Sequence, residues 1–373
     1  MREFVDGAEA IARGALDAGC DFFAGYPITP ATPILLHMVR ELPKMDGVAI
    51  QAEDEIASMG FCIGAAMTGS RVMTATSGPG ISLYSENIGL AIMGEVPMVI
   101  VDVQRMGPST GGATTTAQGD VQFLRWGSGG GYPVIVLAPA TVQDCYRLTR
   151  QAFDLAERFR VPVFIATDKE TVSTRTTIDI DSYEQIPVRE RATANATESF
   201  VPYHVSALDE VPNMSPIGGA HIVRFTGSSH DERGYLTKNA DTVGKLNAHL
   251  NAKIMDHTDE IALVDADLQS DADTLILSYG VTARAAVEAA EQIRANGGKV
   301  SVMTIYSLWP LPEDEIRSAM RGISRVIVPE LNLGLYRREI ERLAEPGCTV
   351  TGIERIDGQL ITPEEIVQKG VQA

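Results

Sequence analysis

Short apolar runs of strand length alternate with longer amphipathic stretches along the first half of this chain. The expected helices are residues 8–18 and 141–158, and the expected strands are residues 22–24, 48–51, 71–76, 97–103, 134–138 and 161–166. Strands that alternate with helices indicate an α/β fold built on a parallel sheet. Because ligands bind such sheets beyond the strand ends, the loops at Gly25, Ser77 and Gln104 are expected to form a site.

The rest of the chain divides into an irregular stretch and a second α/β pattern. Prolines at positions 187, 202, 212 and 216 interrupt short polar stretches, so residues 181–257 are expected to form an irregular connecting segment packed on the first unit. Beyond it, the expected strands are residues 274–278, 300–306 and 324–329. We therefore predict a first domain over residues 1–180, the connecting segment, and a second domain over residues 258–373.

Charge, cysteine usage and hydropathy argue against several classes of function. The formal net charge of −18 over 373 residues argues against binding to nucleic acid or to anionic membrane surfaces. The four cysteines stand far apart, which argues against an iron–sulfur cluster or a metal site on this chain and favours buried free thiols in a reducing compartment. Because no stretch approaches the ~18 apolar residues of a membrane span and the N-terminus lacks the apolar core of a signal peptide, we expect a cytoplasmic protein.

The loop of residues 25–30 reads Gly-Tyr-Pro-Ile-Thr-Pro and is stiff, because prolines fix φ on either side of Ile28 and Thr29. Such a loop can hold the Thr29 hydroxyl at a defined point with little conformational entropy to lose on binding. The alternative is a plain proline turn in which Thr29 caps a helix.

Glu55 opens a stretch, residues 55–66, that is rich in Ala, Gly and Ser. A carboxylate at a helix start is stabilised by the exposed amides and the helix dipole, and the same position can hold it at a fixed distance from a bound ring. The alternative is a surface carboxylate that only caps the helix. Glu53 and Asp54 are adjacent, so charge alone does not select Glu55.

Arg105 follows a buried strand run in a loop, residues 104–111, that reads Gln-Arg-Met-Gly-Pro-Ser-Thr-Gly. An arginine at a strand end can form a two-pronged pair with a carboxylate, and Ser109 and Thr110 supply further donors. The alternative is a surface arginine at a turn. The glycine turn of residues 77–80 is a weaker signal, because it can cradle an anion or only permit tight strand–helix packing.

These motifs together resemble the α subunits of 2-oxoacid:ferredoxin oxidoreductases, of the 2-oxoglutarate synthase type. Tyr-Pro-Ile-Thr-Pro at residues 26–30 is similar to a signature of that family, and the spacing from Glu55 to Gly64 resembles its pyrimidine-binding (PYR) domain for thiamine diphosphate. Later stretches that resemble the family's transketolase C-terminal-like domain are residues 278–280, 308–310 and 330–334. The resemblance covers nearly the whole chain. It implies a PYR-type parallel-sheet domain followed by a transketolase C-terminal-like α/β domain. The second domain has a packing and orienting role and is not the site of chemistry.

The resemblance also implies roles for individual residues. Glu55 hydrogen-bonds the aminopyrimidine ring and activates the cofactor, Thr29 orients the oxoacid carbonyl, and Arg105 holds the oxoacid carboxylate. These three are the expected catalytic residues. The implied cofactor-binding positions are Pro27, Ile28, Glu55, Ser77 and Gly78. The implied substrate-binding positions are Thr29, Arg105, Ser109 and Thr110.

One motif of thiamine enzymes is absent from the sequence. The family binds diphosphate and Mg²⁺ through a Gly-Asp-Gly stretch with a downstream Asn, but here Gly119-Asp120 is followed by Val121. The resemblance therefore implies a partner β subunit that carries the diphosphate site, Mg²⁺ and a [4Fe–4S] cluster, with any γ and δ subunits as separate chains. The implied reaction is oxidative decarboxylation of a 2-oxoacid to acyl-CoA and CO₂, with coenzyme A and ferredoxin as partners. The acidic surface of this chain places ferredoxin docking on a partner subunit.

The substrate stays open between several oxoacids. 2-Oxoglutarate is the leading expectation, although relatives that use it usually carry a Lys in the segment matching residues 114–116 and a His where this chain has Gly129. Branched-chain, aryl or pyruvate-type oxoacids are the alternatives. A split transketolase-like transferase should show a basic phosphate-binding cluster, which the sequence lacks. A scaffolding subunit with a degenerate site is disfavoured because Glu55, Thr29 and Arg105 are all intact.

Overall fold

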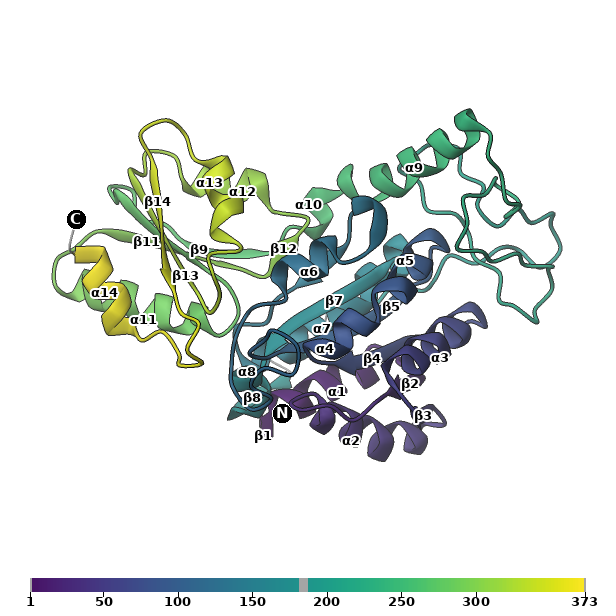
Figure 1. The fold of residues 1–373 in the computed structure, drawn as a ribbon, viewed down its shortest axis with the longest axis horizontal. Coiled ribbons are helices and arrows are strands. Elements are labelled where there is room, and N and C mark those ends of the chain that lie inside the picture. The colour runs from purple at the N-terminus through teal and green to yellow at the C-terminus, as the bar shows by residue number, and fades with distance from the viewer. Residues whose placement is uncertain (1, 181–186, 372–373) are drawn as a thin grey trace.

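The computed structural model describes residues 2–180 and 187–371, which form two large sheets with their covering helices and one small two-stranded sheet (Figure 1). The larger sheet has the strand order β12-β6-β7-β5-β4-β2-β3, and all neighbours are parallel except β12, which pairs antiparallel with β6. Its strands are β2 (Phe22–Gly25), β3 (Val48–Gln51), β4 (Val72–Thr76), β5 (Met98–Gln104), β6 (Ile135–Leu137), β7 (Pro162–Asp168) and β12 (Ser307–Trp309). The parallel α/β sheet expected from the first half of the sequence is confirmed.

Helices cover both faces of this sheet. They are α1 (Gly7–Asp17), α2 (Thr32–Glu41), α3 (Glu55–Met67), α4 (Pro79–Leu83), α5 (Ser85–Met93), α6 (Val121–Trp126), α7 (Val142–Phe159) and α8 (Lys169–Ser173), with 3-10 turns at Leu42–Met45 and Gly129–Gly131. One hydrophobic core lies under α1, α2 and α7, and a second lies under α3, α4, α5 and α6. Every residue of β4, β5 and β7 is buried, as expected for strands covered on both faces.

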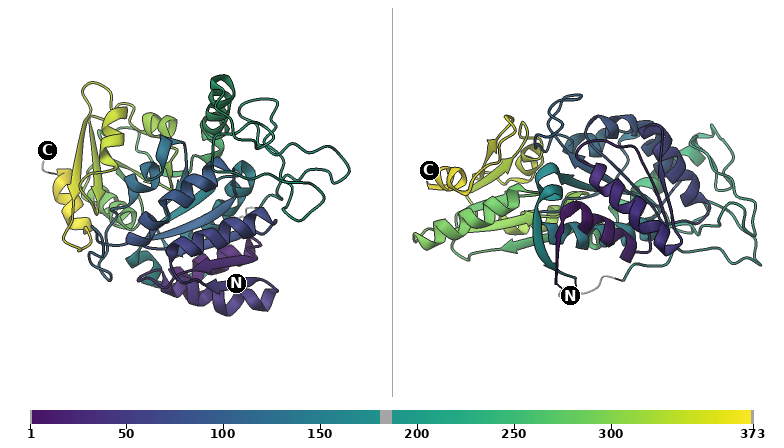
Figure 2. Two further views of the ribbon diagram at one scale, coloured as in Figure 1. Left: turned by 45° about the vertical axis from the view of Figure 1, so that its right-hand side comes forward. Right: turned by 90° about the horizontal axis from the view of Figure 1, so that it is seen from below.

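Two features beside the sheet differ from the sequence expectation. β1 (Arg2–Asp6) and β8 (Arg175–Asp179) form a small antiparallel sheet that the sequence pattern did not indicate. Residues 187–239 contain only isolated bridges, and their loops extend away from the large sheet (Figure 2). The expectation of an irregular segment is wrong for Ala240–Met255, which form helix α9, and its residues 181–186 lie outside the described ranges.

Helix α9 forms because its sequence favours a helix in two ways. The Asn239 side chain caps the helix by accepting the Thr242 amide at 3.0 Å. The apolar side chains of Leu246, Leu250 and Ile254 recur at helical spacing and are buried. The proline count of the segment concealed this pattern, because all of its prolines precede the helix.

The second sheet has the strand order β14-β13-β10-β11-β9, with β9 antiparallel to β11. Its strands are β9 (Val264–Asp267), β10 (Thr274–Ser278), β11 (Val300–Ile305), β13 (Arg325–Glu330) and β14 (Thr349–Glu354). The helices around it are α10 (Thr258–Ile261), α11 (Thr282–Ala295), α12 (Glu313–Ala319), α13 (Arg337–Leu343) and α14 (Pro363–Val371). Helices α11 and α14 cover one face, and α12 and α13 lie on the other (Figure 1).

The two sheets are joined by a shared core and by a buried side chain. Strand β12 leaves the second unit and completes the edge of the large sheet, so that one hydrophobic core contains residues of both units. Gln118 donates from Nε2 to the Tyr279 carbonyl at 3.2 Å and accepts the Leu331 amide on Oε1 at 3.1 Å. These contacts hold the stretch after β13 close to the loops that follow β4 and β5.

Within the described ranges, no helix has both the length and the apolar character needed to cross a membrane. The four cysteines are free thiols, as expected from their spacing, and Cys20, Cys62 and Cys145 are buried. Burial raises the pKa of the Cys62 thiol to about 12, which keeps it protonated at neutral pH.

Candidate active site

Three loops at the carboxyl ends of neighbouring strands converge on the Arg105 side chain. Arg105 directly follows β5, and its Nη1 donates to the carbonyl of Thr29, which lies 76 residues earlier in the loop after β2. Its Nη2 donates to the Thr110 carbonyl at 3.3 Å. A Cβ built on Gly78, in the turn after β4, would lie 3.5 Å from the Cγ and Nε of Arg105. The structure therefore brings Thr29, Gly78 and Arg105 together.

Glu55 begins helix α3 but does not cap it. The cap is Asp54, whose carboxylate accepts the Ala57 amide at 2.7 Å. Glu55 is only 8% exposed, and its carboxylate makes no hydrogen bond or ion pair within the described parts of the chain. The capping role thus belongs to its neighbour, and the Glu55 carboxylate stays uncommitted.

The turn after β4 approaches both Arg105 and Glu55, and glycine makes each approach possible. Gly78 has a φ of 43°, in the region that favours glycine. A Cβ on Gly80 would lie 3.2 Å from Glu55 Oε1 and would overlap the Thr76 hydroxyl. The glycines that the sequence presented as a weak signal therefore have a definite steric role.

Several buried polar atoms around this turn lack a hydrogen-bond partner among residues 2–180 and 187–371. They include Thr76 Oγ1, Ser77 Oγ and Arg105 Nε. A buried donor or acceptor without a partner costs about 1–3 kcal/mol of stability. Such atoms are rare in native interiors and concentrate where a ligand completes the structure.

A cavity of about 700 Å³ opens beside Arg105, between the two sheets. On the side of the large sheet it is lined by Gly78, Pro79, Ser82, Arg105, Met106, Gly107, Pro108, Ser109, Ala117, Gly119 and Asp120. The opposite wall comes from the second unit, through Leu331, Asn332, Leu333, Leu335 and Ile356. This volume is in the range of small-molecule sites. The stretch after β13, expected to act as scaffold, thus forms part of the cavity.

Two carboxyls, that of buried Asp102 and that of half-buried Asp120, lie near the same turn. Asp102 is on β5, and Asp120 stands at the start of α6 and borders the cavity. Burial, with a further contribution from the Asp120 charge, raises the pKa of Asp102 well above its usual range. Burial raises the pKa of Asp120 to about 6, and the Arg105 guanidinium opposes this rise. The two carboxyls therefore share one proton at neutral pH.

The remaining sequence-predicted residues lie at the edge of this arrangement. Pro27 and Ile28 are half-buried, and Ile28 packs against the core under α1, α2 and α7. Ser109 is exposed and borders the cavity. Thr110 is exposed, and its carbonyl accepts the hydrogen bond from Arg105. Thr29 likewise contacts Arg105 through its carbonyl.

Sequence reasoning missed three residues of the site, namely Asp102, Asp120 and Asn332. A signal for Asp102 was present, because an aspartate inside a fully apolar strand run is rare unless it is partnered. Asp120 was considered only as part of an incomplete diphosphate motif. Asn332 could not be found from the pattern, since its amide donates to the Gln118 carbonyl at 2.8 Å and the Tyr279 hydroxyl at 3.0 Å, far away in sequence.

Among the described residues, no group of three or more His, Cys, Asp or Glu side chains is placed to hold a metal ion. What the site offers is a buried guanidinium, an uncommitted carboxylate and a cavity of ligand size, all at the carboxyl ends of a parallel sheet. This combination defines the chain as the active-site part of an α/β enzyme.

Comparison with known proteins specifies the family. The family model described as pyruvate flavodoxin/ferredoxin oxidoreductase, thiamine-diphosphate-binding, matches residues 13–248. The model described as pyruvate:ferredoxin oxidoreductase core domain II matches residues 272–366. The chain belongs to this oxidoreductase family, and the sequence prediction of a 2-oxoacid:ferredoxin oxidoreductase α subunit is confirmed.

Individual relatives agree with this assignment. The 2-oxoglutarate synthase subunit KorA of Methanothermobacter thermautotrophicus is 42% identical over 98% of this chain and 96% of its own length. The ketoisovalerate oxidoreductase subunit VorB of the same organism is 33% identical over 98% of this chain and 96% of its own. A solved 2-oxoglutarate:ferredoxin oxidoreductase from Magnetococcus marinus, with 2-oxoglutarate, coenzyme A and succinyl-CoA bound, superposes with a TM-score of 0.92 at 31% identity, covering 100% of this chain and 65% of that chain.

Proposed function

We propose that this chain, with a partner β subunit, oxidatively decarboxylates 2-oxoglutarate, with coenzyme A as acyl acceptor and ferredoxin as electron acceptor. The observation that carries the proposal is the meeting of the loops of Thr29 and Gly78 at the buried Arg105 guanidinium, with Glu55 uncommitted beside it. Full-length relatives named as 2-oxoglutarate synthase subunits support the choice of substrate.

The site has the features that thiamine diphosphate requires. Glu55 offers a buried carboxylate with no internal partner, Gly80 leaves space next to it, and the Ser77 hydroxyl is buried without a partner. We assign Glu55 to a nitrogen of the pyrimidine ring. The positions assigned to further cofactor contacts are Pro27, Ile28, Ser77 and Gly78. When bound, thiamine diphosphate supplies a carbon nucleophile for the oxoacid carbonyl and takes up the electron pair left when CO₂ departs.

Arg105 supplies the charge that holds the oxoacid carboxylate. Its Nη groups are fixed by the carbonyls of Thr29 and Thr110, and its buried Nε–H remains available to donate. A hydrogen bond from a guanidinium to a carboxylate is about twice as strong as a neutral one, and burial strengthens it further. The stiff loop around Thr29 keeps the carbonyl of the oxoacid in position, and Ser109 borders the same cavity.

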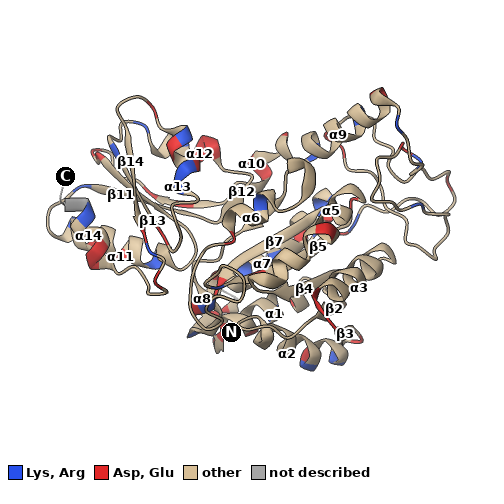
Figure 3. Cartoon of the chain, in the orientation of Figure 1, with Lys and Arg blue, Asp and Glu red and all other residues tan. Residues whose placement is uncertain are grey.

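An apolar surface next to Glu55 supports a partner subunit. Ile56 and Phe61 on α3 and Leu83 on α4 are 52%, 47% and 47% exposed, although they lie on the helices that carry Glu55 and Gly80. Gly60 and Gly64 on the same helix leave open space where a Cβ would stand. Helix α3 carries no charged residue after Glu55, and Figure 3 accordingly draws it in tan beyond its first turn. A β subunit that covers this surface would complete the site and bring the diphosphate-binding residues, Mg²⁺ and a [4Fe–4S] cluster.

A branched-chain oxoacid is a close alternative to 2-oxoglutarate as the substrate. The cavity has one buried arginine and an apolar wall at Leu331, Leu333 and Leu335, which would also accept a branched oxoacid. The ketoisovalerate oxidoreductase relative makes that alternative concrete. The higher identity to the 2-oxoglutarate synthase subunit decides for 2-oxoglutarate.

The test is an activity panel on the complex co-expressed with its β subunit. Reduction of methyl viologen that depends on coenzyme A is measured with 2-oxoglutarate, pyruvate, 2-oxoisovalerate and phenylglyoxylate. The proposal expects the highest kcat/KM for 2-oxoglutarate. A higher value for 2-oxoisovalerate would change the substrate and keep the reaction, whereas a cofactor-loaded complex inactive with all four would refute the reaction.

A further inference from the structure

Asp120 stands where an aspartate usually caps a helix, but its side chain does not cap. It is the N-cap residue of α6, and its carboxyl accepts no amide hydrogen of that helix. The Asp120 amide is instead fixed by Gln104, whose Oε1 accepts it at 3.1 Å. The backbone is thus held by another residue, and the Asp120 Oδ2 atom is buried without a hydrogen-bond partner among the described residues.

The carboxyl that interacts with Asp120 belongs to Asp102. It is wholly buried near the end of β5, where its register neighbours are Thr76 on β4 and Ala166 on β7. Neither neighbour carries a charge. Both carboxyl oxygens of Asp102 are buried without a hydrogen-bond partner among the described residues, and the groups that influence its pKa are the Asp120 carboxyl and the Gly78 amide. Two interacting carboxyls with little access to solvent do not both ionise, so one proton between them stabilises the pair.

Arg105 provides the counter-charge for this pair. Its guanidinium favours the ionised form of Asp120. The other carboxyls at this end of the sheet are placed differently. Asp168, in register with Gln104, accepts the Thr171 amide at 2.8 Å and the Val281 amide at 3.1 Å. Glu55 lies against Gly80 and Thr76. Asp120 is therefore the carboxylate that shares the charge of Arg105 before a ligand arrives.

We propose that binding of the oxoacid carboxylate at Arg105 is coupled to uptake of one proton by the Asp102–Asp120 pair, which makes these two aspartates positioning residues for Arg105. The inference rests on the proposed function, because it requires an oxoacid at Arg105. An incoming carboxylate adds a second negative charge to a buried space that already holds ionised Asp120. Protonation of Asp120 removes that repulsion and leaves the guanidinium to the substrate.

One proton moves between solvent and the Asp102–Asp120 pair in this step. The proton comes from solvent through the cavity that Asp120 lines. The pair goes from one bound proton to two, and no bond to carbon forms or breaks. When the product leaves, the pair returns the proton to solvent. Oxoacid binding should then weaken as the pH rises above the pKa of Asp120, near 6.

The direct test is titration calorimetry of 2-oxoglutarate into the α–β complex from which thiamine diphosphate has been removed, so that no chemistry follows binding. Measurements at about pH 7.5 in two buffers of different ionisation enthalpy give the number of protons taken up per oxoacid. We expect a value approaching about one for the wild type and zero for Asp120→Asn. The control is Asp46→Asn, which removes an exposed charge at a residue with a φ of 60°, a conformation that Asn tolerates. It should leave proton uptake unchanged.

A kinetic test uses the loaded complex. The kcat/KM of the wild type should fall by up to about tenfold per pH unit above Asp120's pKa, while kcat changes little. Asp120→Asn should remove this falling limb and lower KM at alkaline pH. Asp120→Ser keeps a residue that favours the N-cap and carries no charge, so it provides a second variant if the first does not fold.

The results of these tests distinguish failure of the proton coupling from failure of the proposed function. Oxoacid binding without proton uptake in the wild type, or a falling limb that persists in Asp120→Asn and Asp120→Ser, overturns the coupling and leaves the proposed function standing. A wild-type complex that neither binds 2-oxoglutarate nor reduces viologen with any oxoacid overturns the proposed function, and the coupling falls with it.

Discussion

Gly80 lies against the Glu55 carboxylate so closely that a Cβ at position 80 would sit 3.2 Å from Glu55 Oε1 and would overlap the Thr76 hydroxyl. Helix α4 can therefore start at this place only with glycine at its second residue. Glycine at position 80 therefore allows the Glu55 carboxylate to lie where it does. With a methyl group at position 80, either helix α4 or Glu55 would have to move.

Gly80→Ala should therefore lower kcat by about a hundredfold, since a displacement of about 1 Å at a reacting group has an effect of that size. The measurement is oxoacid-dependent viologen reduction by the complex. Gly244→Ala on α9 is the control, because a Cβ there meets nothing within 4 Å. The control should keep full activity and stabilise the chain by about 0.5–1 kcal/mol. Full activity in Gly80→Ala would show that Glu55 tolerates displacement or takes no part in the reaction.

Glu55→Gln should reduce kcat by about 10²–10⁴-fold, the usual effect of removing a group that holds or moves a proton at the reacting centre. The free energy of unfolding should hardly change, because the Glu55 carboxylate makes no hydrogen bond that the amide would lose. Urea denaturation separates the two effects. Glu53→Gln, two residues earlier and exposed, is the matched control and should remain active. An active Glu55→Gln enzyme would remove the assigned role.

Sequence patterns found the six parallel strands of the large sheet and Glu55 but not the contacts between distant loops. The run from Met98 to Gln104 is apolar enough to identify a buried strand, and the position of Glu55 at a helix start is local information. The contact between Thr29 and Arg105 depends on the order in which β2, β4 and β5 lie in the sheet, which no local pattern encodes. Asp102 is visible as an aspartate inside an apolar run, but its role is not, since that role depends on Asp120, which comes near it only in the folded chain.

Arg105→Lys should raise KM for the oxoacid by about 30- to 150-fold with a small change in kcat, equivalent to about 2–3 kcal/mol for a lost hydrogen bond to a charged group. A guanidinium can donate to the carbonyls of Thr29 and Thr110 and still present Nε–H to a carboxylate. An ammonium group is a single point charge and cannot keep all three contacts. Steady-state kinetics with varied oxoacid gives both constants. An unchanged KM would show that the carboxylate binds elsewhere.

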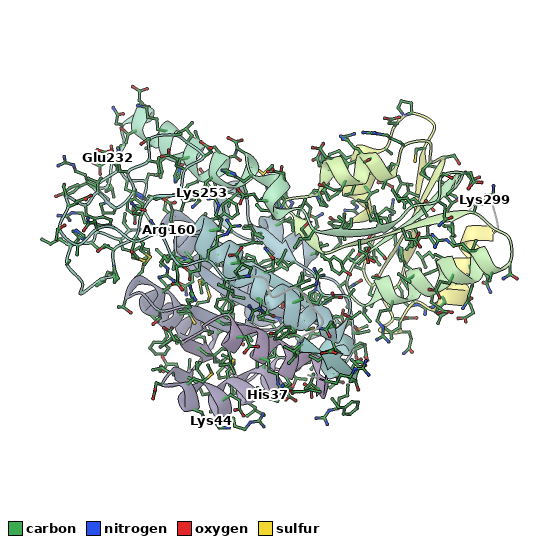
Figure 4. The ribbon with its side chains drawn as sticks, turned by 180° about the vertical axis from the view of Figure 1, so that it is seen from behind. His37, Lys44, Arg160, Glu232, Lys253 and Lys299 are labelled. Carbon is green, nitrogen blue, oxygen red and sulfur yellow. The ribbon has the colours of Figure 1, made fainter. Side chains whose placement is uncertain are left out.

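A buried ion pair fixes helix α9 to the large sheet. Glu95, in the turn between α5 and β5, accepts a hydrogen bond from Lys253 Nζ at 2.8 Å and lies 3.1 Å from His249 Nε2. Arg160 donates to the Glu95 carbonyl at 3.2 Å. Figure 4 places Lys253 and Arg160 in the same region, between α9 and the sheet. Burial alone would oppose ionisation of Glu95, but Lys253, His249 and Arg160 outweigh it and hold the pKa of Glu95 below its usual range.

Lys253→Met should destabilise the chain by about 3–5 kcal/mol, because it leaves a buried carboxylate without its main partner. The double variant Glu95→Gln with Lys253→Met should recover part of this loss, since it removes both charges. Lys245→Met, exposed on the same helix, is the control and should change stability by no more than about 0.5 kcal/mol. Guanidinium denaturation of the three variants gives the comparison, and a Lys253→Met chain as stable as the control would contradict the assignment.

The same pair makes a prediction about pH. Because the folded-state pKa of Glu95 lies below the ordinary value of 4.5, its ionisation stabilises the fold above that value. This stabilisation is lost progressively as the pH falls below about 4.5 towards the folded-state pKa, where the folded chain must take up a proton that the unfolded chain already holds. Glutamine does not titrate, so the Glu95→Gln variant has no such stabilisation to lose. Its free energy of unfolding should decline less than that of the wild type between about pH 5 and pH 3. The measurement is the free energy of unfolding of both proteins across this pH range. An equal decline in the two proteins would contradict the role assigned to Glu95.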